Sequence, residues 1–174
     1  MPWSALENYV RRSMQLTGRR SAPSHNCTDT TLKRTLRRFR PGGTIAELDA
    51  FDSDVLIYAA GDDARATAIR AVIRDSSRPL GSTVLIPEVL TRPMRRGERK
   101  EYDVLVLLLA QLDLKAVDDE IADAATVLGA NYGLRAADAI HLATAVVWGA
   151  DRFHTNNRKD FGPHITEVEV VYPA

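Results

Sequence analysis

From residue 44 onward, apolar and polar positions follow two alternating patterns that predict strands and helices in turn. Short apolar runs predict strands, whereas apolar residues spaced three or four apart predict helices with one buried face. Helices of 10–15 residues between short strands indicate an α/β fold with a mostly parallel central sheet and helices on both faces. The strands are expected at residues 48–52, 82–86, 114–117, 152–155 and, at one edge, 168–172.

The first strand is expected to end at Asp52, with a helix from Ser53 that includes the apolar residues 55–60. The same apolar residues would also suit a buried strand, so periodicity alone leaves two readings open. If the strand ends at Asp52, this acid lies at the carboxyl end of a strand, where open α/β sheets bind ligands.

Capping residues predict where the later helices begin and end. The segment at residues 102–112 is apolar almost all round, which predicts a helix buried on more than one side. The alanine-rich segment at 136–148 predicts a helix that lies close to its neighbours. The expected end residues are Asp62 or Asp63 and Ser76, then Pro87, then Asp118 and Gly133, and finally Gly149.

The chain has 174 residues, of which 45% are hydrophobic and 26% charged, as expected for one globular domain with some additional sequence. The longest apolar run, at residues 104–110, is too short to span a membrane, and the N-terminus lacks an export signal. The single cysteine, Cys27, cannot form an internal disulfide and suits a reducing compartment. A cytoplasmic protein is expected.

Charge divides the chain into two parts, although the overall net charge is zero. Residues 1–43 hold nine Lys and Arg against two Asp and Glu, a net of +7, and residues 44–174 hold 14 against 21, a net of −7. The first part, residues 1–43, predicts a basic N-terminal extension, loosely ordered or helical, and the second, residues 44–174, a single α/β domain. The extension could bind nucleic acid or a partner, or be a passive tail or upstream sequence included by a start-site error.

Acids follow several of the predicted strands or lie in the first turn of a helix. Asp52 follows the first strand, Glu88 the second, and Asp138 opens the alanine-rich helix three residues before His141. Carboxylates crowded at one sheet edge repel one another, and a divalent cation is the usual remedy. Hard oxygen ligands without clustered Cys or His predict Mg²⁺, with Mn²⁺ as the alternative.

Each of these residues also has a purely structural explanation. Acids in the first turn of a helix stabilise its dipole by about 0.3–1 kcal/mol, which could account for Glu88, Asp138 or Asp54. For Asp54 this structural explanation is preferred to a metal-binding role. His141, on an apolar helix, is read as a packed histidine rather than a base.

Four motifs in this order and spacing resemble the PIN domain, and more narrowly the VapC toxins of VapBC toxin–antitoxin pairs. The similarity covers about residues 45–173 and leaves the basic extension unexplained. The motifs are Phe51-Asp52-Ser53-Asp54-Val55-Leu56-Ile57-Tyr58, Ile86-Pro87-Glu88-Val89-Leu90, the segment from Gly133 to Ala145, and the segment from Thr155 to Phe161.

The resemblance implies a metal-dependent endoribonuclease whose acids are Asp52, Glu88 and Asp138, with the polar Thr155 beside them. It also supports a helix directly after Asp52. The family often has a fourth aspartate two residues after the threonine, where this chain has Asn157. That difference removes one negative charge, which should weaken the metal or leave a single tight ion. Asp160 could compensate in part, although it aligns with the family's ordinary Asp-Phe pair.

An acidic site needs cations from elsewhere to receive the substrate's phosphates. The basic residues after Glu88 are candidates for RNA contact, above all Arg92, Arg95 and Arg96, with Arg99 and Lys100 following. The alternative is a solvated basic turn balanced by Glu98, Glu101 and Asp103. The resemblance further implies a homodimer and a VapB-like antitoxin that blocks the site.

Two other functions fit parts of the sequence. Asp52 and Asp54 resemble the Asp-x-Asp of haloacid-dehalogenase-type phosphatases, in which Asp52 would be the nucleophile and Asp54 the acid/base. That reading needs a later lysine and a late acid pair, and no stretch fits well. A non-catalytic PIN-like RNA-binding module is the second alternative, and Asn157 makes it plausible.

Overall fold

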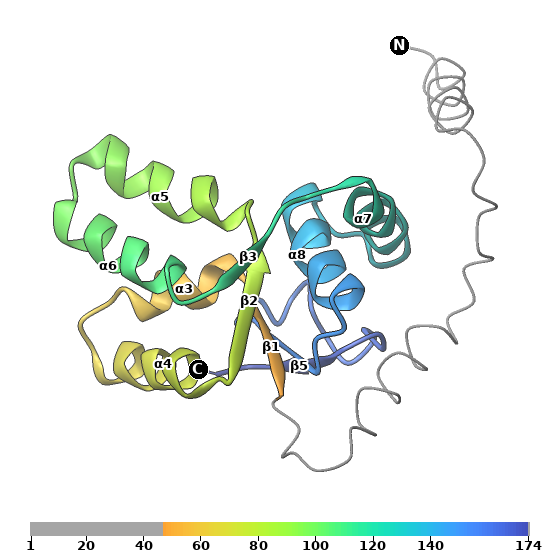
Figure 1. Cartoon of the computed structure of the whole chain (residues 1–174), viewed down its shortest axis with the longest axis horizontal. Helices are drawn as coiled ribbons and strands as arrows, with labels where there is room; N and C mark the ends of the chain where they lie inside the picture. The colour runs from red at the N-terminus through yellow and green to blue at the C-terminus, as the bar shows by residue number, and fades with distance from the viewer. Residues whose placement is uncertain (1–46, 174) are drawn as a thin grey trace.

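The computed structural model describes residues 47–173, which form a five-stranded sheet in the order β3-β2-β1-β4-β5 (Figure 1). All four strand pairings are parallel. The predictions for the basic extension at residues 1–43 lie outside the described residues. The strands are β1 (Leu48–Phe51), β2 (Arg78–Ser82), β3 (Asp113–Lys115), β4 (Arg152–His154) and β5 (Glu169–Val171).

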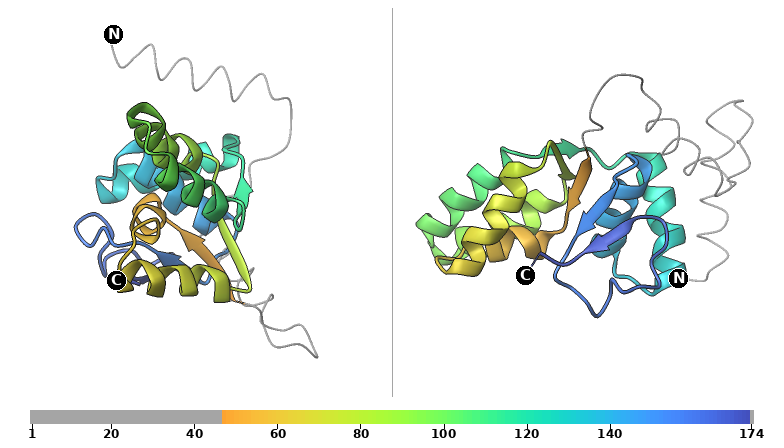
Figure 2. Two further views of the ribbon diagram at one scale, coloured as in Figure 1. Left: turned by 90° about the vertical axis from the view of Figure 1, so that its left-hand side faces the viewer. Right: turned by 90° about the horizontal axis from the view of Figure 1, so that it is seen from below.

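Helices cover both faces of the sheet, as the sequence predicts (Figures 1 and 2). Helices α3 to α6 pack on one face in a cluster that includes Phe51, and α7 and α8 pack on the other in a cluster that includes Leu48 and Ala50. Alternate residues of β1 therefore enter opposite cores. The helices are α3 (Ser53–Ala59), α4 (Ala64–Asp75), α5 (Leu85–Arg96), α6 (Arg99–Leu109), α7 (Asp119–Tyr132) and α8 (Ala136–Val147).

The predicted helix ends are mostly found. Asp63 caps α4 by accepting a hydrogen bond from Ala66 N at 2.7 Å, and Asp118 caps α7 in the same way. Gly133 ends α7 with φ of 67°, in the left-handed region that glycine adopts without strain. None of the helices within residues 47–173 combines the length and hydropathy that crossing a bilayer requires.

The second strand lies four residues before its predicted position, at 78–82 instead of 82–86. The prediction was wrong because Pro79 and Gly81 have low strand propensity, whereas the observed strand is stabilised by distant pairing partners. Pro79 lies opposite Asp49 of β1 and before the part of β2 that pairs with β3. A Cβ at Gly81 would lie 2.4 Å from Leu85 Cδ1, so a larger residue there would force the buried Leu85 side chain to shift.

Helices α5 and α6 also differ from the prediction. Since the chain turns at residues 83–84, α5 begins at Leu85 rather than at Pro87, and Arg92, Arg95 and Arg96 lie within this helix rather than in a loop. Helix α6 runs over 99–109 and is buried on one side only. Leu107 is 67% exposed, so the predicted burial on more than one side is wrong.

Candidate active site

Asp52 connects β1 to α3 and is 2% exposed. Its Oδ1 accepts a hydrogen bond from Ser53 N at 2.7 Å, so the carboxylate caps the helix that follows. Its Oδ2 accepts a hydrogen bond from Thr155 Oγ1 at 2.8 Å. Asp52 and Thr155 follow neighbouring parallel strands, so the predicted pair meets at the carboxyl edge of the sheet.

The segment after β4 is built around the Thr155 hydroxyl. Thr155 is fully buried, and Oγ1 accepts a hydrogen bond from Asn157 N at 3.1 Å while donating to Asp52. The Asn157 amide is paired with Asp160: Nδ2 donates to Asp160 Oδ2 at 2.8 Å, and Oδ1 accepts from Asp160 N at 3.3 Å. Asn157 therefore lies beside the site with both side-chain atoms already engaged.

Asp54 has a role beyond that of a first-turn acid, although it is also in the first turn of α3. Its two oxygens accept a hydrogen bond from Asn156 N at 3.2 and 3.0 Å. This contact holds the segment after β4 against α3. The sequence offered no local signal for it, because the two residues are 102 positions apart.

The electrostatics show that three acids lie near one another. Burial raises the pKa of Asp52, a rise that His141 and Thr155 oppose and that Asp138 increases. Burial and the neighbouring Asp52 raise the pKa of Asp54 to about 6, with a smaller contribution from Asp138. Buried carboxylates that lack a compensating cation respond in this way.

Asp138 lies in the first turn of α8, as predicted, and faces the same region. Its Oδ2 lies 3.4 Å from Nε of Arg135, a side chain that is 83% exposed. An ion pair with an exposed arginine is weak, because water screens it. Asp138 is therefore free to exchange this partner at little cost.

Glu88 contacts a histidine of α8. Its Oε2 lies 2.5 Å from Nε2 of His141, which is buried in α8. Because an ionised carboxylate can only accept a hydrogen bond, His141 Nε2 is the donor and carries a proton. The other ring nitrogen, Nδ1, is buried without a hydrogen-bond partner among the described residues. In a neutral ring Nδ1 is therefore the unprotonated nitrogen. His141 is thus packed, as expected, and also connects Glu88 to the helix that carries Asp138.

The basic residues predicted to contact RNA are mostly paired with acids. Arg92 Nη2 lies 2.5 Å from Glu101, whereas Arg96 and Arg99 lie 3.8 Å from Glu98 and Asp103. These pairs match the alternative reading of a balanced, solvated basic turn. Arg95 is exposed and forms no ion pair within residues 47–173.

The acids have the ligand atoms that a hard divalent cation prefers, but their side chains are not grouped closely enough to bind one. Carboxylate oxygens suit Mg²⁺ or Mn²⁺, and burial, together with neighbouring acids, raises the pKa of Asp52 and of Asp54. Within residues 47–173, however, no three His, Cys, Asp or Glu side chains are grouped to hold a metal ion. Glu88 would have to leave His141 to join such a group.

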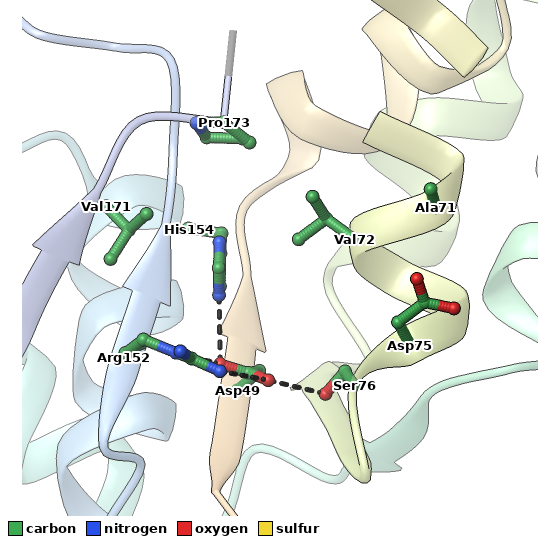
Figure 3. A pocket seen from close by; sticks show the side chains of 9 residues that line it. All are labelled: Asp49, Ala71, Val72, Asp75, Ser76, Arg152, His154, Val171 and Pro173. Atoms are coloured by element: carbon green, nitrogen blue, oxygen red, sulfur yellow. Dashed lines mark hydrogen bonds and ion pairs between the residues drawn. The ribbon is translucent and has the colours of Figure 1, made fainter. Parts of the chain in front are cut away.

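A separate cavity of about 420 Å³ opens between α4 and strands β4 and β5 (Figure 3). Asp49, Ser76, Arg152 and His154 line it, and none of the predicted acids does. Burial would raise the pKa of Asp49, but hydrogen bonds from His154, Arg152 and Ser76 outweigh burial and hold it well below its usual range. Because these partners satisfy the Asp49 carboxylate, we interpret this cluster as a structural network.

The fold and the site together define an α/β protein with acids gathered at the carboxyl edge of a parallel sheet. The sequence model of the PIN domain family matches residues 50–162, more than half of the chain. The chain therefore belongs to the PIN domain family. No curated protein sequence matches it.

Solved structures with the same fold include three toxin–antitoxin complexes. A toxin–antitoxin complex from Klebsiella pneumoniae has 23% identity and a TM-score of 0.60, covering 74% of this chain and 98% of that one. VapBC2 from Rickettsia felis, bound to a promoter DNA fragment, has 14% identity and a TM-score of 0.59, covering 72% and 98%. DNA-bound VapBC from Salmonella typhimurium has 15% identity and a TM-score of 0.61, covering 74% and 99%. At these identities the similarity establishes the fold alone.

Proposed function

We propose that this chain is the toxin of a type II toxin–antitoxin pair and acts as a Mg²⁺- or Mn²⁺-dependent endoribonuclease. The observation that carries the proposal is the meeting of Asp52 with Thr155 at one sheet edge, where Asp138 contributes to the raised pKa of Asp52 and Asp52 contributes to that of Asp54. Buried carboxylates in such a group are costly unless they serve a cation. Membership of the PIN domain family supports the same conclusion.

In this proposal Asp52, Asp138 and Glu88 hold the divalent cation. A cation bound there would neutralise charge on the scissile phosphate and lower the pKa of the attacking water. Thr155 orients the Asp52 carboxylate through the 2.8 Å hydrogen bond. His141 contacts Glu88 and would position it in the protein without a bound cation. A carboxylate of the group accepts the proton of the water.

A VapB-like antitoxin is the proposed protein partner. Helices α3, α5 and α6 expose apolar side chains that a single folded domain would normally cover. These side chains are Ile57, Tyr58, Ile86, Met94, Val106 and Leu107, between 39% and 67% exposed. Solved structures with the same fold include toxin–antitoxin complexes, and in this proposal an apolar antitoxin segment covers these helices. A homodimer and a cytoplasmic location remain predictions.

Cleavage of a mixed RNA pool tests the enzymatic proposal. Purified protein should cut RNA with Mg²⁺ or Mn²⁺ and stop in EDTA. Asp52→Asn, Glu88→Gln and Asp138→Asn should each lower the rate by more than about 100-fold, the upper end for loss of a residue that merely supports a ligand. Asp123→Asn, an exposed acid on α7, is the matched control and should cleave normally.

The alternative is a PIN-like module that binds RNA without cutting it. RNA binding without metal-dependent cleavage, in protein that demonstrably binds Mn²⁺, would contradict the nuclease and favour this module. Loss of the fold in all three acid variants would instead assign these acids to structure. Membership of the PIN domain family sets aside the phosphatase reading of Asp52 and Asp54.

A further inference from the structure

The acidic site needs a cationic contact for RNA, and the arginines of α5 and α6 are poorly suited to provide it. Three of the four, Arg92, Arg96 and Arg99, already lie within 4 Å of a carboxylate. The charge of each partner would stay beside a bound phosphate and repel the RNA, and Arg95 is the arginine of these two helices that has no such partner within residues 47–173. The contact is better sought elsewhere on the same sheet edge.

Arg158 follows the site residues directly in the chain. It is the residue after Asn157, whose backbone N–H donates to Thr155 Oγ1, the atom that in turn donates to Asp52. A backbone hydrogen bond from Arg158 N to Asn156 O, at 2.9 Å, stabilises the turn at these residues. The side chain is exposed and forms no ion pair with any acid of residues 47–173.

The Arg158 guanidinium rests instead on an aromatic ring. Its Cζ lies 4.2 Å from the centroid of the Tyr172 ring. The Tyr172 hydroxyl donates to Phe161 O at 2.5 Å, and Phe161 is fully buried, so the ring is attached to the core. A guanidinium stacked on a fixed ring loses little freedom on binding, and its in-plane N–H groups stay available to an anion.

Tyr172 directly follows β5, and Thr155 directly follows β4. Because the strands are parallel, the two residues lie at the same edge of the sheet. Neighbouring strands are about 4.8 Å apart, so β5 is roughly 10 Å from β1, the strand that leads to Asp52. Arg158 is therefore displaced from the acids along the edge, where a bound RNA strand would continue.

We propose that Arg158, held on the Tyr172 ring, binds a backbone phosphate of the RNA next to the one that is cleaved. This inference rests on the proposed nuclease function and adds its substrate contact. A guanidinium binds phosphate oxygens in a bidentate manner, and this contact carries no base specificity. Arg158 is thus a substrate-binding residue and takes no part in the chemical step.

The test is RNA binding and cleavage by Arg158→Gln, with Arg78→Gln as the matched control. Arg78 is an exposed arginine at the start of β2 and lies at the amino end of the strands, opposite to the carboxyl end where the acids lie. Its replacement by Gln changes the net charge by the same amount as Arg158→Gln. In the Asp52→Asn background, Arg158→Gln should weaken binding of a single-stranded RNA oligonucleotide about tenfold. The plot of log binding constant against log salt concentration should also become less steep, its slope changing by about 0.7. That is the contribution of one phosphate contact in single-stranded nucleic acid. With Asp52 present, KM should rise about tenfold and kcat change less than threefold.

Tyr172 supplies a second, independent variant. Tyr172→Leu removes the ring and should reproduce part of the Arg158→Gln effect, and the double variant should bind no more weakly than Arg158→Gln alone. Additive losses would overturn the role of the ring in holding Arg158. Equal binding by Arg158→Gln and Arg78→Gln would overturn the phosphate contact, even if the protein cleaves RNA. A wild-type protein that binds RNA without cutting it would contradict the nuclease function while leaving the binding test of Arg158 intact.

Discussion

His141 Nε2 lies 2.5 Å from Glu88 Oε2, and this contact connects α8 to α5 across 53 residues of sequence. The imidazole side chain is 1% exposed, whereas the carboxylate is 32% exposed. Glu88 can therefore move toward solvent or a cation more easily than His141 can. Of the three proposed metal ligands, Glu88 is the one that contacts a buried histidine.

We expect His141→Ala to weaken Mn²⁺ binding by about 10–100-fold, the usual effect of removing a residue that orients a ligand. The variant should also lower the free energy of unfolding by about 1–3 kcal/mol, because a buried hydrogen bond is lost. Mn²⁺ titration monitored by calorimetry measures the first effect. His141→Gln retains a donor and should recover part of the affinity, and His164→Ala, at an exposed histidine, is the control. Unchanged Mn²⁺ affinity in His141→Ala would show that His141 only packs.

Local signals in the sequence were sufficient to predict several elements. Periodicity left the end of β1 open between two readings, and the resemblance to the PIN domain favoured the helix that begins at Ser53. Asp63, Asp118 and Gly133 marked helix ends. These features depend on neighbours within four residues. The strand β2 could not be predicted in this way, because the pairing of Leu80 with Ala50 and Asp113 is what makes residues 78–82 a strand.

The site was predictable to the extent that it follows from the order of strands. The carboxyl ends of parallel strands share one edge, so the sequence predicted that Asp52 and the polar residues after later strands would converge. The resemblance to the PIN domain added Thr155 beside Asp52. It could not predict that Glu88 would turn to His141, or that Asp54 would bind Asn156 N, since these contacts span 53 and 102 residues. Such contacts depend on how helices pack, which no local pattern encodes.

Thr155→Val should separate the hydrogen bonds of the threonine from its shape. Valine has nearly the same shape, but Asp52 Oδ2 would lose its donor and Asn157 N its acceptor in a fully buried position. The free energy of unfolding, measured by urea denaturation, should fall by about 1–3 kcal/mol. The pKa of Asp52 should rise further, because Thr155 normally lowers it. Thr155→Ser keeps the hydroxyl and should lose clearly less stability, and equal losses in the two variants would refute this role.

Asp54 should make the metal-free protein less stable as pH increases. Burial and the Asp52 charge raise its pKa from 3.8 to about 6 in the folded state. The folded protein therefore binds more protons than the unfolded protein between these values, and stability falls as pH rises through that window. Asp54→Asn should be more stable than wild type above pH 6 by about 1 kcal/mol, after allowance for partial solvent screening.

Thermal unfolding of Asp54→Asn and wild type in EDTA, compared at about pH 3 and about pH 8, measures this effect. The difference should vanish at the lower pH, where Asp54 is protonated in both states. Asp49 has the opposite dependence, since its pKa is held well below the usual range, and comparing the two proteins cancels its contribution. A stability difference that does not depend on pH would contradict the assignment to Asp54.

Restoring an acid at position 157 should not by itself improve the site. Asn157 Nδ2 donates to Asp160 Oδ2 at 2.8 Å, so a carboxylate at position 157 would face another carboxylate where a hydrogen bond now stands. Asn157→Asp should therefore lower the free energy of unfolding without metal by about 1–3 kcal/mol. Mn²⁺ should recover part of this loss if the new carboxylate reaches the metal.

The exchange variant Asn157→Asp with Asp160→Asn is the matched control, because it keeps the charge and restores one donor facing one acceptor. It should recover most of the metal-free stability and bind Mn²⁺ more tightly than wild type, since the charge moves to the position that follows Thr155 more closely. Urea denaturation and Mn²⁺ titration of the three proteins measure both effects. If Asn157→Asp alone is as stable as wild type in EDTA, the Asn157–Asp160 hydrogen bonds do not stabilise the segment after β4. The asparagine at position 157 would then have no role in stabilising this segment.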